Sequence, residues 1–552
     1  MEAATHRETI RARLRGRVRG STSRLWLAGF VALVGLVNLI VLLAQAPALV
    51  HSVYLNADNA SALVLPALAS HAPAGSIVNL GNHPWYEPWW FMRATIGIPG
   101  HYGLWEAAPF LFGLLGIAVV AACAWWALGW VAGLLCAVAL LATSESLRDI
   151  LYVPESHGAV ALHVGVLCGA LLIVYRKALR AQSRPAVLLV VGIPLVVFTG
   201  AGLTDQLLLI SGLGPFILAP LLCRARFESD VWRTVSLFAL VTGVLSGLLA
   251  LLLTHIMQEQ HVIHAPFPVS FVESEAMLRG LQNLVVTVAS LGGGAFFGEP
   301  ASGLTLLTFV LGVLTLLALA AILRALWRWA VSTDRRSEAH PQREGTRELF
   351  IAYWGLVLVA TIAAFVLTSV SGNTSNGRYL VGAWWAMAAL LGILASTPIA
   401  RTVLLVGVGL FGVLNIRAEL VNGVQPAGVG PSQRLAGVIE HYATAHGATI
   451  GYSGYWDASP VTWDTRMRIT IYPVVPCAAP TGLCPFYANN ISTWYDARAN
   501  TRTFLLTDTR PGVSSAVVSP PKSLGRPLAK AYMGEGMAVY IYNHDIAADL
   551  SE

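Results

Sequence analysis

Charged residues are scarce in this sequence. Asp, Glu, Lys and Arg make up 12% of its 552 residues, whereas a soluble domain carries roughly 25%. Hydrophobic residues make up 56%, and the mean hydropathy is +0.64. A chain this long and this apolar is a polytopic membrane protein rather than one large soluble core.

The sequence also lacks the short motifs that mark several enzyme classes. It has no Gly-rich phosphate loop, no nucleophile elbow and no HExxH. Its six cysteines show neither CxxC nor His-rich metal spacing. The net charge is +6, but the arginines lie mostly in short runs between apolar segments, as membrane topology produces. We therefore expect no nucleic-acid partner.

What the sequence does have is a series of about eleven apolar segments that could span a bilayer. They are residues 25–46, 107–125, 127–144, 158–175, 186–203, 206–222, 233–256, 304–326, 349–369, 379–397 and 402–417. The first could be a signal peptide cleaved after Ala46, but it is long for one, and Pro47 would follow the cut. We expect a retained helix, preceded by a basic cytoplasmic N-terminus over residues 1–24.

Arginine orients these segments. If the N-terminus is cytoplasmic, the loops on the cytoplasmic side carry arginine, and the loops on the opposite side carry fewer arginines for their length. The outer loops are then 47–106, 144–157, 203–206, 257–303 and 370–378. The Arg-over-Lys bias is typical of a GC-rich bacterium. We predict a multi-pass protein of the bacterial inner (cytoplasmic) membrane, with its C-terminal region in the periplasm or otherwise outside the cytoplasm.

After residue 417 the composition changes to Gly, Pro, Thr, Tyr and Asp. We therefore predict a membrane module over 25–417 and an extracytoplasmic α/β domain over 418–552. The expected elements of this domain are a helix over 433–446 and strands over 448–452, 503–507 and 538–542. Cys477 and Cys484 lie near prolines in a compartment that allows disulfides, so we expect them to form a disulfide that closes a small loop.

Asp58 follows the first apolar segment. A lone carboxylate at the end of a span usually faces water. At a partly desolvated membrane interface, however, the pKa of such a carboxyl rises, and it can serve as a general base. The aromatic and ionisable side chains that follow favour this second interpretation.

Segment 82–93 of the first outer loop is dense in aromatic residues. Trp and Tyr favour headgroup depth, so one interpretation is an anchor at the membrane interface. His83 and Arg93 could additionally face a lipid phosphate, and Glu87 a sugar or a metal. In loop 257–303, the amphipathic segment 271–290 is expected to lie along the interface.

Further ionisable residues lie in the other outer loops. Glu155 could complement a helix N-terminus, or with His157 it could bind a metal or a sugar hydroxyl. Asp205 lies between two apolar runs, where its burial requires a partner. Arg378 is the only strong base of its loop. It either snorkels at the surface or binds a phosphate through its planar fork of donors.

Together these features resemble the GT-C superfamily of integral membrane glycosyltransferases. The resemblance rests on Asp58 after the first span, on Glu155-Ser156-His157 in the second outer loop, and on Gly377-Arg378-Tyr379-Leu380 before a late span. It rests also on a multi-span body with a soluble C-terminal domain. It covers most of residues 25–417 and implies a GT-C-like helical membrane fold of about eleven spans.

The resemblance implies transfer of a sugar, hexosyl or pentosyl, from a polyprenyl-phosphate donor held in the membrane lipids. The acceptor would be a cell-envelope glycan, lipid or protein outside the cytoplasm. The superfamily's first-loop acid maps onto Asp58, which would act as general base with inversion of configuration. Arg378, then Arg93 and His83, are the candidates for binding the donor phosphate.

The resemblance also makes a divalent metal ion, Mg or Mn, a candidate cofactor. Some members of the superfamily hold one with acids from the first two outer loops, which here would involve Asp58, Glu155 and His157. The sequence lacks the clear paired acids of the metal-dependent oligosaccharyltransferases, so no metal is assigned.

Three other functions compete with this one. A lipid-linked polysaccharide polymerase or ligase would rely on outer arginine and histidine rather than on Asp58. A lipid-linked sugar transporter or flippase would bind its substrate at mid-membrane, but the span centres hold few ionisable groups and no inverted repeat is evident. A noncatalytic assembly protein would use its soluble domain as an adaptor.

Overall fold

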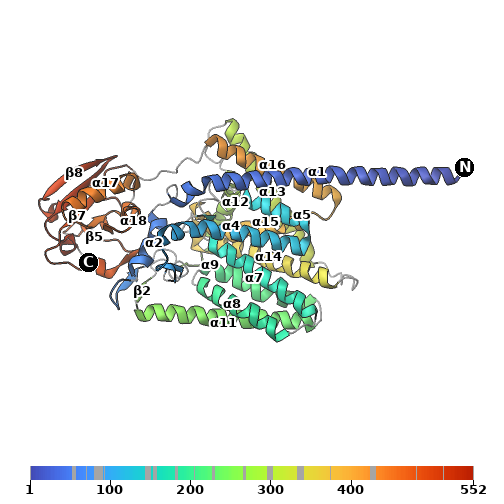
Figure 1. The fold of residues 1–552 in the computed structure, drawn as a ribbon, viewed down its shortest axis with the longest axis horizontal. Coiled ribbons are helices and arrows are strands. Elements are labelled where there is room, and N and C mark those ends of the chain that lie inside the picture. The colour runs from blue at the N-terminus through green and yellow to red at the C-terminus, as the bar shows by residue number, and fades with distance from the viewer. Residues whose placement is uncertain are drawn as a thin grey trace.

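The computed structural model (Figure 1) is a long helical bundle with a strand-containing domain at one end. The described residues are 2–51, 57–69, 71–79, 91–92, 94–142, 144, 151–152, 158–180, 184–203, 206–226, 230–260, 262–264, 269–294, 302–331, 341–372, 374–422, 431–479, 481–511, 513 and 515–550. The N-terminal helix points away from the C-terminal domain, and the two lie at opposite ends of the molecule.

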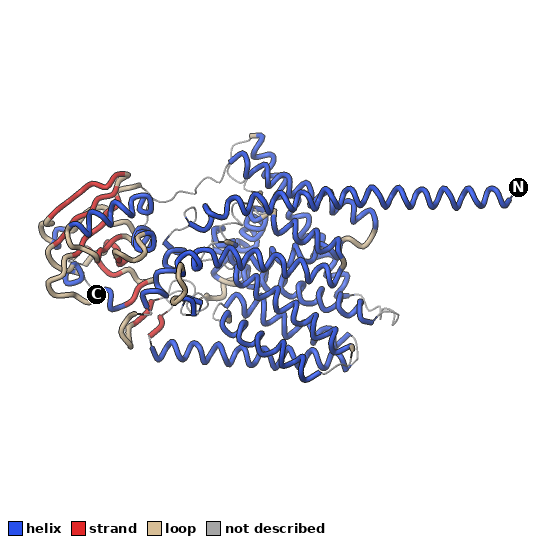
Figure 2. The backbone as a smooth tube through the Cα atoms, in the orientation of Figure 1, coloured by secondary structure: helices blue, strands red, loops and turns tan. Residues whose placement is uncertain are grey.

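Helices form the body of the molecule (Figure 2). The longer ones are α1 (Glu2–His51), α4 (His101–Leu128), α5 (Trp130–Leu141), α7 (Gly158–Leu179), α8 (Arg184–Gly202), α10 (Gly214–Arg226), α11 (Asp230–Gln260), α13 (Gly303–Val331), α14 (Pro341–Leu367), α15 (Val381–Leu394) and α16 (Pro398–Asn422). Shorter pieces are α9 (Gln206–Leu208), the π-helix η1 (Leu209–Leu213), and the 3-10 helices η2 (Ser369–Gly372) and η3 (Thr374–Leu380).

Every one of the eleven predicted apolar segments is helical over most of its length. Among the described residues, eight helices are long and apolar enough to cross a membrane. The other three segments are the shorter apolar helices Trp130–Leu141, Leu189–Gly202 and Leu209–Ala225. Large apolar side chains cover the outside of the bundle, as a surface in contact with lipid requires. The chain is a polytopic helical membrane protein, as its sequence predicts.

Small residues allow these helices to approach closely. A Cβ on Gly392 of α15 would stand 2.3 Å from the Cβ of Ala132 on α5, so the two backbones touch. Such contacts replace the hydrophobic driving force that is missing between helices in lipid. Gly129 separates α4 from α5 with φ of 100°, a positive value that favours glycine and makes a one-residue turn between the two helices.

The C-terminal domain contains a six-stranded mixed sheet of order β5-β4-β3-β7-β9-β8. Its strands are β3 (Ile450–Ser453), β4 (Thr470–Pro476), β5 (Leu483–Pro485), β7 (Thr503–Asp508), β8 (Ala529–Gly534) and β9 (Met537–Tyr542). The central strand β3 runs parallel to β4 and β7, and the other pairs are antiparallel. Helices α17 (Pro431–Ala445) and α18 (Tyr455–Asp464) complete the predicted α/β domain.

The sheet is buried on both faces. Alternate residues of β7 point to opposite sides, so Phe504 and Leu506 pack with α17 and α18, while Leu505 packs into a second core. Short 3-10 helices and loops contribute to that second core: η4 (Ser492–Tyr495), η5 (Lys522–Leu524) and η6 (Ile546–Asp549). Cys477 and Cys484 form a disulfide with Cα atoms 5.9 Å apart. The division of the chain at residue 418 stays a prediction.

Candidate active site

Helix α2 (Ala57–Ala69), in the loop 47–106, is held between the membrane bundle and the C-terminal domain. One side of it, including Ala62 and Leu65, belongs to the second core of the C-terminal sheet. Another side, including Leu63 and Val64, packs against a cluster that contains Trp105 of α4 and Trp463 of α18. From Ala60 to Ala69 this helix is almost entirely apolar and therefore has to be buried, and it is buried by packing against both parts of the protein.

The first turn of α2 carries Asp58. Its backbone lies in the helix, and its side chain falls outside the described residues. The preceding residue, Ala57, is fully buried against Tyr455, Phe486 and Ala488 of the C-terminal domain. The start of α2 is therefore enclosed by a domain that begins more than 350 residues later in the sequence.

Hydrogen bonds fix α2 and its surroundings. The Ser61 hydroxyl donates to the Ser459 hydroxyl of α18 at 3.0 Å. The Asn489 amide nitrogen donates to the Tyr455 hydroxyl at 2.7 Å, and the Tyr455 ring stacks on Phe486 with centroids 4.5 Å apart. Aromatic side chains of the C-terminal domain therefore pack around Ala57 at the start of α2.

A small sheet links the same three parts of the chain. Strand β1 (Ile77–Asn79) follows α2, and it pairs in parallel with β2 (Val262–His264) and antiparallel with β6 (Asn490–Ile491). The Asn79 amide also donates to Asn490 Oδ1 at 2.7 Å. The loop 47–106, the loop 257–303 and the C-terminal domain therefore meet at one end of the bundle.

Arg378 lies in η3, between α14 and α15, and is partly buried. Its guanidinium carbon stands 5.4 Å from the centre of the Tyr379 ring, a cation–π distance. Nearby, the Asn376 amide donates to the Val370 carbonyl at 2.7 Å and fixes the fold of the segment. The arginine is thus held by a structured segment rather than by an open loop.

Helix α12 (Ser274–Leu291) packs against η2 and η3, which together are called the Arg378 segment. It corresponds to the predicted amphipathic segment. The Asn283 amide donates to the Ser371 carbonyl at 2.6 Å, and a Cβ on Gly280 would stand 2.7 Å from the Ser371 hydroxyl. Just before α12, Phe271 forms a bridge with Thr368. Loop 257–303 therefore contacts both the loop 47–106 and the Arg378 segment.

Most other candidate residues fall outside the described part of the chain, and their roles stay predictions. They are His83, Glu87, Arg93, Glu155, His157 and Asp205. Within the described residues, no group of three or more His, Cys, Asp or Glu side chains could hold a metal ion. The donors that a metal would need, Asp58, Glu155 and His157, have no described side chain, so no step is assigned to a metal.

Sequence reasoning missed a buried ion pair between the two parts of the protein. Glu106, near the start of α4, accepts from Trp463 Nε1 at 2.8 Å and from Arg466 Nη1 at 2.6 Å. The Arg466 guanidinium also lies over the rings of Tyr102 and Trp463. The available signal was an acidic residue just before a long apolar run, where a carboxylate needs a partner.

A second group of charges lies at the carboxyl ends of β3 and β7. Asp508, the last residue of β7, and Asp457, in the first turn of α18, are each 1% exposed. Arg510 Nη2 lies 2.6 Å from Asp508 and 3.2 Å from Asp457. In parallel α/β sheets this edge is where ligands bind. Here Tyr455, which opens α18 at the same edge, contacts the start of α2.

No family model matches the chain, and no curated protein matches it by sequence. Its backbone is similar to that of ArnT from Cupriavidus metallidurans in the apo state, with a TM-score of 0.40 and 14% identity, over 93% of this chain and 99% of that one.

It is also similar to two structures of the Archaeoglobus fulgidus oligosaccharyltransferase. One is tethered to an acceptor peptide, with a TM-score of 0.39 and 14% identity, over 79% of this chain and 63% of that one. The other, AglB in complex with an inhibitory peptide and a dolichol-phosphate, has a TM-score of 0.42 and 13% identity, over 81% and 64%. This chain therefore spans less than two thirds of the length of either.

Proposed function

We propose that the chain is an inverting membrane glycosyltransferase of the GT-C type. It transfers a sugar from a polyprenyl-phosphate donor to an acceptor outside the cytoplasm. The observation that carries this proposal is the position of α2. A helix with an aspartate in its first turn is clamped between a membrane bundle and a soluble domain, where a lipid-borne donor and a water-borne acceptor meet.

Asp58 acts as the general base. It takes the proton from an acceptor hydroxyl while that oxygen attacks the anomeric carbon of the donor sugar. The bond from the anomeric carbon to the phosphate oxygen breaks, and the lipid phosphate leaves with the electron pair. The anomeric configuration inverts. The burial of the preceding residue, Ala57, supports this role, because desolvation makes a carboxylate a stronger base.

Arg378 binds the donor phosphate. A polyprenyl tail keeps the donor in the bilayer, so its phosphate stays near headgroup depth, at the outer ends of the spans. A guanidinium held by η3 and covered by α12 presents fixed donors to the charge that develops on the leaving phosphate. Arg93 and His83 are further phosphate ligands in this proposal, and Glu87, Glu155, His157 and Asp205 contact the sugar or a metal.

The C-terminal domain selects the acceptor, a glycan, lipid or protein of the cell envelope. Two aromatic residues near the start of α2 are accessible, Trp456 at 37% and Tyr487 at 56% exposure. Tyr487 packs on Phe486, whose ring stacks on Tyr455. An exposed aromatic surface with a rigid base suits the apolar face of a sugar ring. Exposed aromatic rings beside the proposed base support an acceptor site there.

Activity is tested with the full chain reconstituted in liposomes that contain radiolabelled polyprenyl-phosphate sugars and crude envelope acceptor. Asp58→Asn should lower transfer by a factor of about 10² to 10⁴, the range for a general base. Glu259→Gln changes an exposed carboxylate on α11 and should leave transfer intact. Full activity in Asp58→Asn would overturn the assignment of the base.

The rival functions separate in the same assay. A polymerase or ligase would lose more activity on replacement of outer arginines and histidines than in Asp58→Asn. A transporter would move the labelled lipid across the bilayer without forming a new glycosidic bond.

A further inference from the structure

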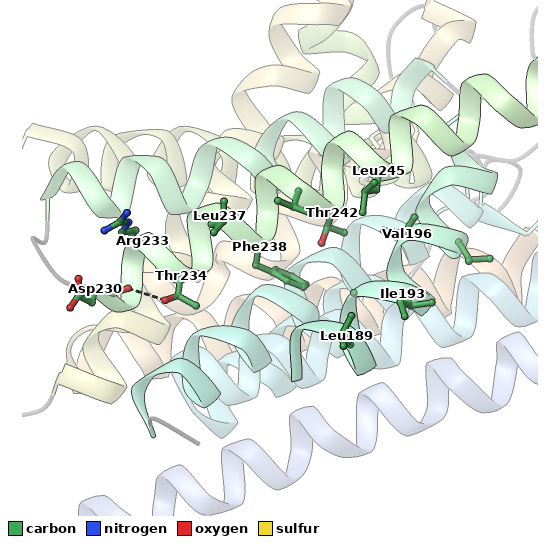
Figure 3. A pocket seen from close by; sticks show the side chains of 13 residues that line it. Leu189, Ile193, Val196, Asp230, Arg233, Thr234, Leu237, Phe238, Thr242 and Leu245 are labelled. Atoms are coloured by element: carbon green, nitrogen blue, oxygen red, sulfur yellow. Dashed lines mark hydrogen bonds between the residues drawn. The ribbon is translucent and has the colours of Figure 1, made fainter. Parts of the chain in front are cut away.

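A groove of about 680 Å³ lies between α8 and α11, on the side of the bundle. Figure 3 shows its lining, which is mostly aliphatic: Leu189, Ile193 and Val196 come from α8, and Leu237 and Leu245 from α11. Leu189, Ile193 and Leu237 are each about 60% exposed, with 59%, 60% and 59%. The groove therefore opens sideways, toward the hydrocarbon of the membrane.

The floor of the groove is shaped by one small residue and two buried ones. Gly192 has no side chain, and a Cβ there would stand 3.5 Å from the Phe238 ring and 3.9 Å from the Thr242 hydroxyl. Phe238 and Thr242 are 5% and 3% exposed. Gly192 thus keeps open a depression between helices that otherwise pack directly against each other.

Polar residues gather at one end only. Asp230, Arg233 and Thr234 lie in the first turns of α11, and Figure 3 shows them at the same end of the groove. The Thr234 hydroxyl donates to the Asp230 carbonyl at 3.0 Å, and the carboxylate of Asp230 suits a helix N-terminus. The other end of α11 leads into β2, so this end is the one remote from the C-terminal domain.

The dimensions of the groove fit one leaflet. Arg233 and Leu245 are twelve residues apart on α11, which is about 18 Å at 1.5 Å per residue. The hydrocarbon core of a bilayer is about 30 Å thick, so a chain lying in the groove would cross roughly one leaflet. A guanidinium at the mouth and an apolar trough behind it match a phosphate headgroup followed by an acyl chain.

We propose that this groove binds an anionic phospholipid of the leaflet opposite the C-terminal domain. The phosphate contacts Arg233, and one acyl chain lies over Gly192 and Phe238. This site is distinct from the proposed donor site, which lies at the other end of the bundle, and it does not depend on the proposed function. A basic residue near a membrane surface contributes about 1 kcal/mol to binding an anionic lipid, which is about fivefold.

Native mass spectrometry of the full chain in mild detergent tests the proposal, with phosphatidylglycerol or phosphatidylcholine added. Wild type should retain about fivefold more phosphatidylglycerol than phosphatidylcholine, and Arg233→Gln should abolish this preference. Arg224→Gln removes an exposed charge near the same end of the bundle but outside the groove, and should preserve it.

A second pair of variants tests the apolar part of the groove. Gly192→Leu should fill it and lower the retention of both lipids, whereas Gly247→Leu, on α11 where nothing lies within 4 Å of an added Cβ, should not. Equal retention of the two lipids by wild type, or an unchanged preference in Arg233→Gln, would overturn the proposal.

Discussion

Among single residues, Arg378 carries the proposed phosphate site. Arg378→Lys keeps the positive charge but loses the planar fork, and Arg378→Ala loses both. Charge-assisted hydrogen bonds contribute about 1.5 to 3 kcal/mol, so we expect the KM for the donor to rise about 10-fold to 100-fold in the alanine variant, with a smaller rise for lysine. Steady-state kinetics at saturating acceptor measure this.

Tyr379→Phe provides the matched control for Arg378. It removes only a hydroxyl and keeps the ring over which the guanidinium lies. If Arg378→Ala leaves the donor KM unchanged while Tyr379→Phe is also silent, the arginine has no place in the phosphate site.

Asp464, at the C-terminal end of α18, predicts a pH dependence of stability. Burial raises the pKa of its carboxyl from 3.8 to about 7, and Glu106 adds to this, while Arg466 and a hydrogen bond from Gln433 oppose it. The folded state therefore holds the proton more tightly than the unfolded state. The contribution of this carboxyl to the free energy of unfolding is fully present below pH 4 and is lost as the pH rises toward 7.

Replacing this carboxyl should remove the effect. Asp464→Asn should stabilise the C-terminal domain at pH 8, by at most about 4 kcal/mol at 1.36 kcal/mol per pKa unit. Hydrogen exchange of β3 and β7 in the full chain, measured from pH 4 to 8, reports it. Asp496→Asn, at an exposed site, is the control. An unchanged pH profile in Asp464→Asn would contradict the prediction.

At the scale of elements, we expect transfer activity to depend most on the contact between α12 and the Arg378 segment. Gly280→Ala places a Cβ 2.7 Å from the Ser371 hydroxyl and 3.1 Å from the Val366 carbonyl, so α12 has to shift. We expect transfer activity to fall several-fold, with an increased donor KM, because the segment that positions Arg378 moves. Gly247→Ala meets nothing within 4 Å and should be neutral. Equal activity in the two variants would show that this contact is dispensable.

Element positions also show what the sequence could predict. Hydropathy found the membrane helices, since a span must be apolar whatever it contacts. Periodicity predicted α17, α12 and the strands β3, β7 and β9, but it missed β4, β5, β8 and α18 of the C-terminal domain. The role of α2 was not predictable, because its burial depends on partners about 400 residues away, such as Ser459 for Ser61. The candidate acids and bases were chosen by residue type and stay predictions, because local patterns contain no information on which of them meet.

At the scale of the whole molecule, Glu106 joins the membrane bundle to the C-terminal domain. Its carboxylate is buried, while Arg466 is partly exposed, with 5% and 36% of their side chains accessible. Glu106→Ala leaves the indole and guanidinium donors without their acceptor, at a cost of about 1.5 to 3 kcal/mol to docking. We expect faster cleavage of the C-terminal domain in limited proteolysis, and a smaller change in Glu106→Gln.

A surface ion pair of the C-terminal domain serves as the control for Glu106. Glu535→Gln breaks the pair with Arg434, which is largely exposed and should contribute little. If Glu106→Ala is cleaved no faster than Glu535→Gln, the Glu106 contact does not hold the domain in place.

The central claim is that Asp58, at the start of the clamped helix α2, faces the anomeric carbon of a lipid-phosphate sugar. A structure of the full chain with a non-hydrolysable polyprenyl-phosphate sugar bound tests it most directly. We expect the phosphate within hydrogen-bond distance of Arg378 and the Asp58 carboxylate on the opposite face of the anomeric carbon. A sugar whose anomeric carbon faces Glu155 or Glu87 instead, with Asp58 turned away, would contradict it.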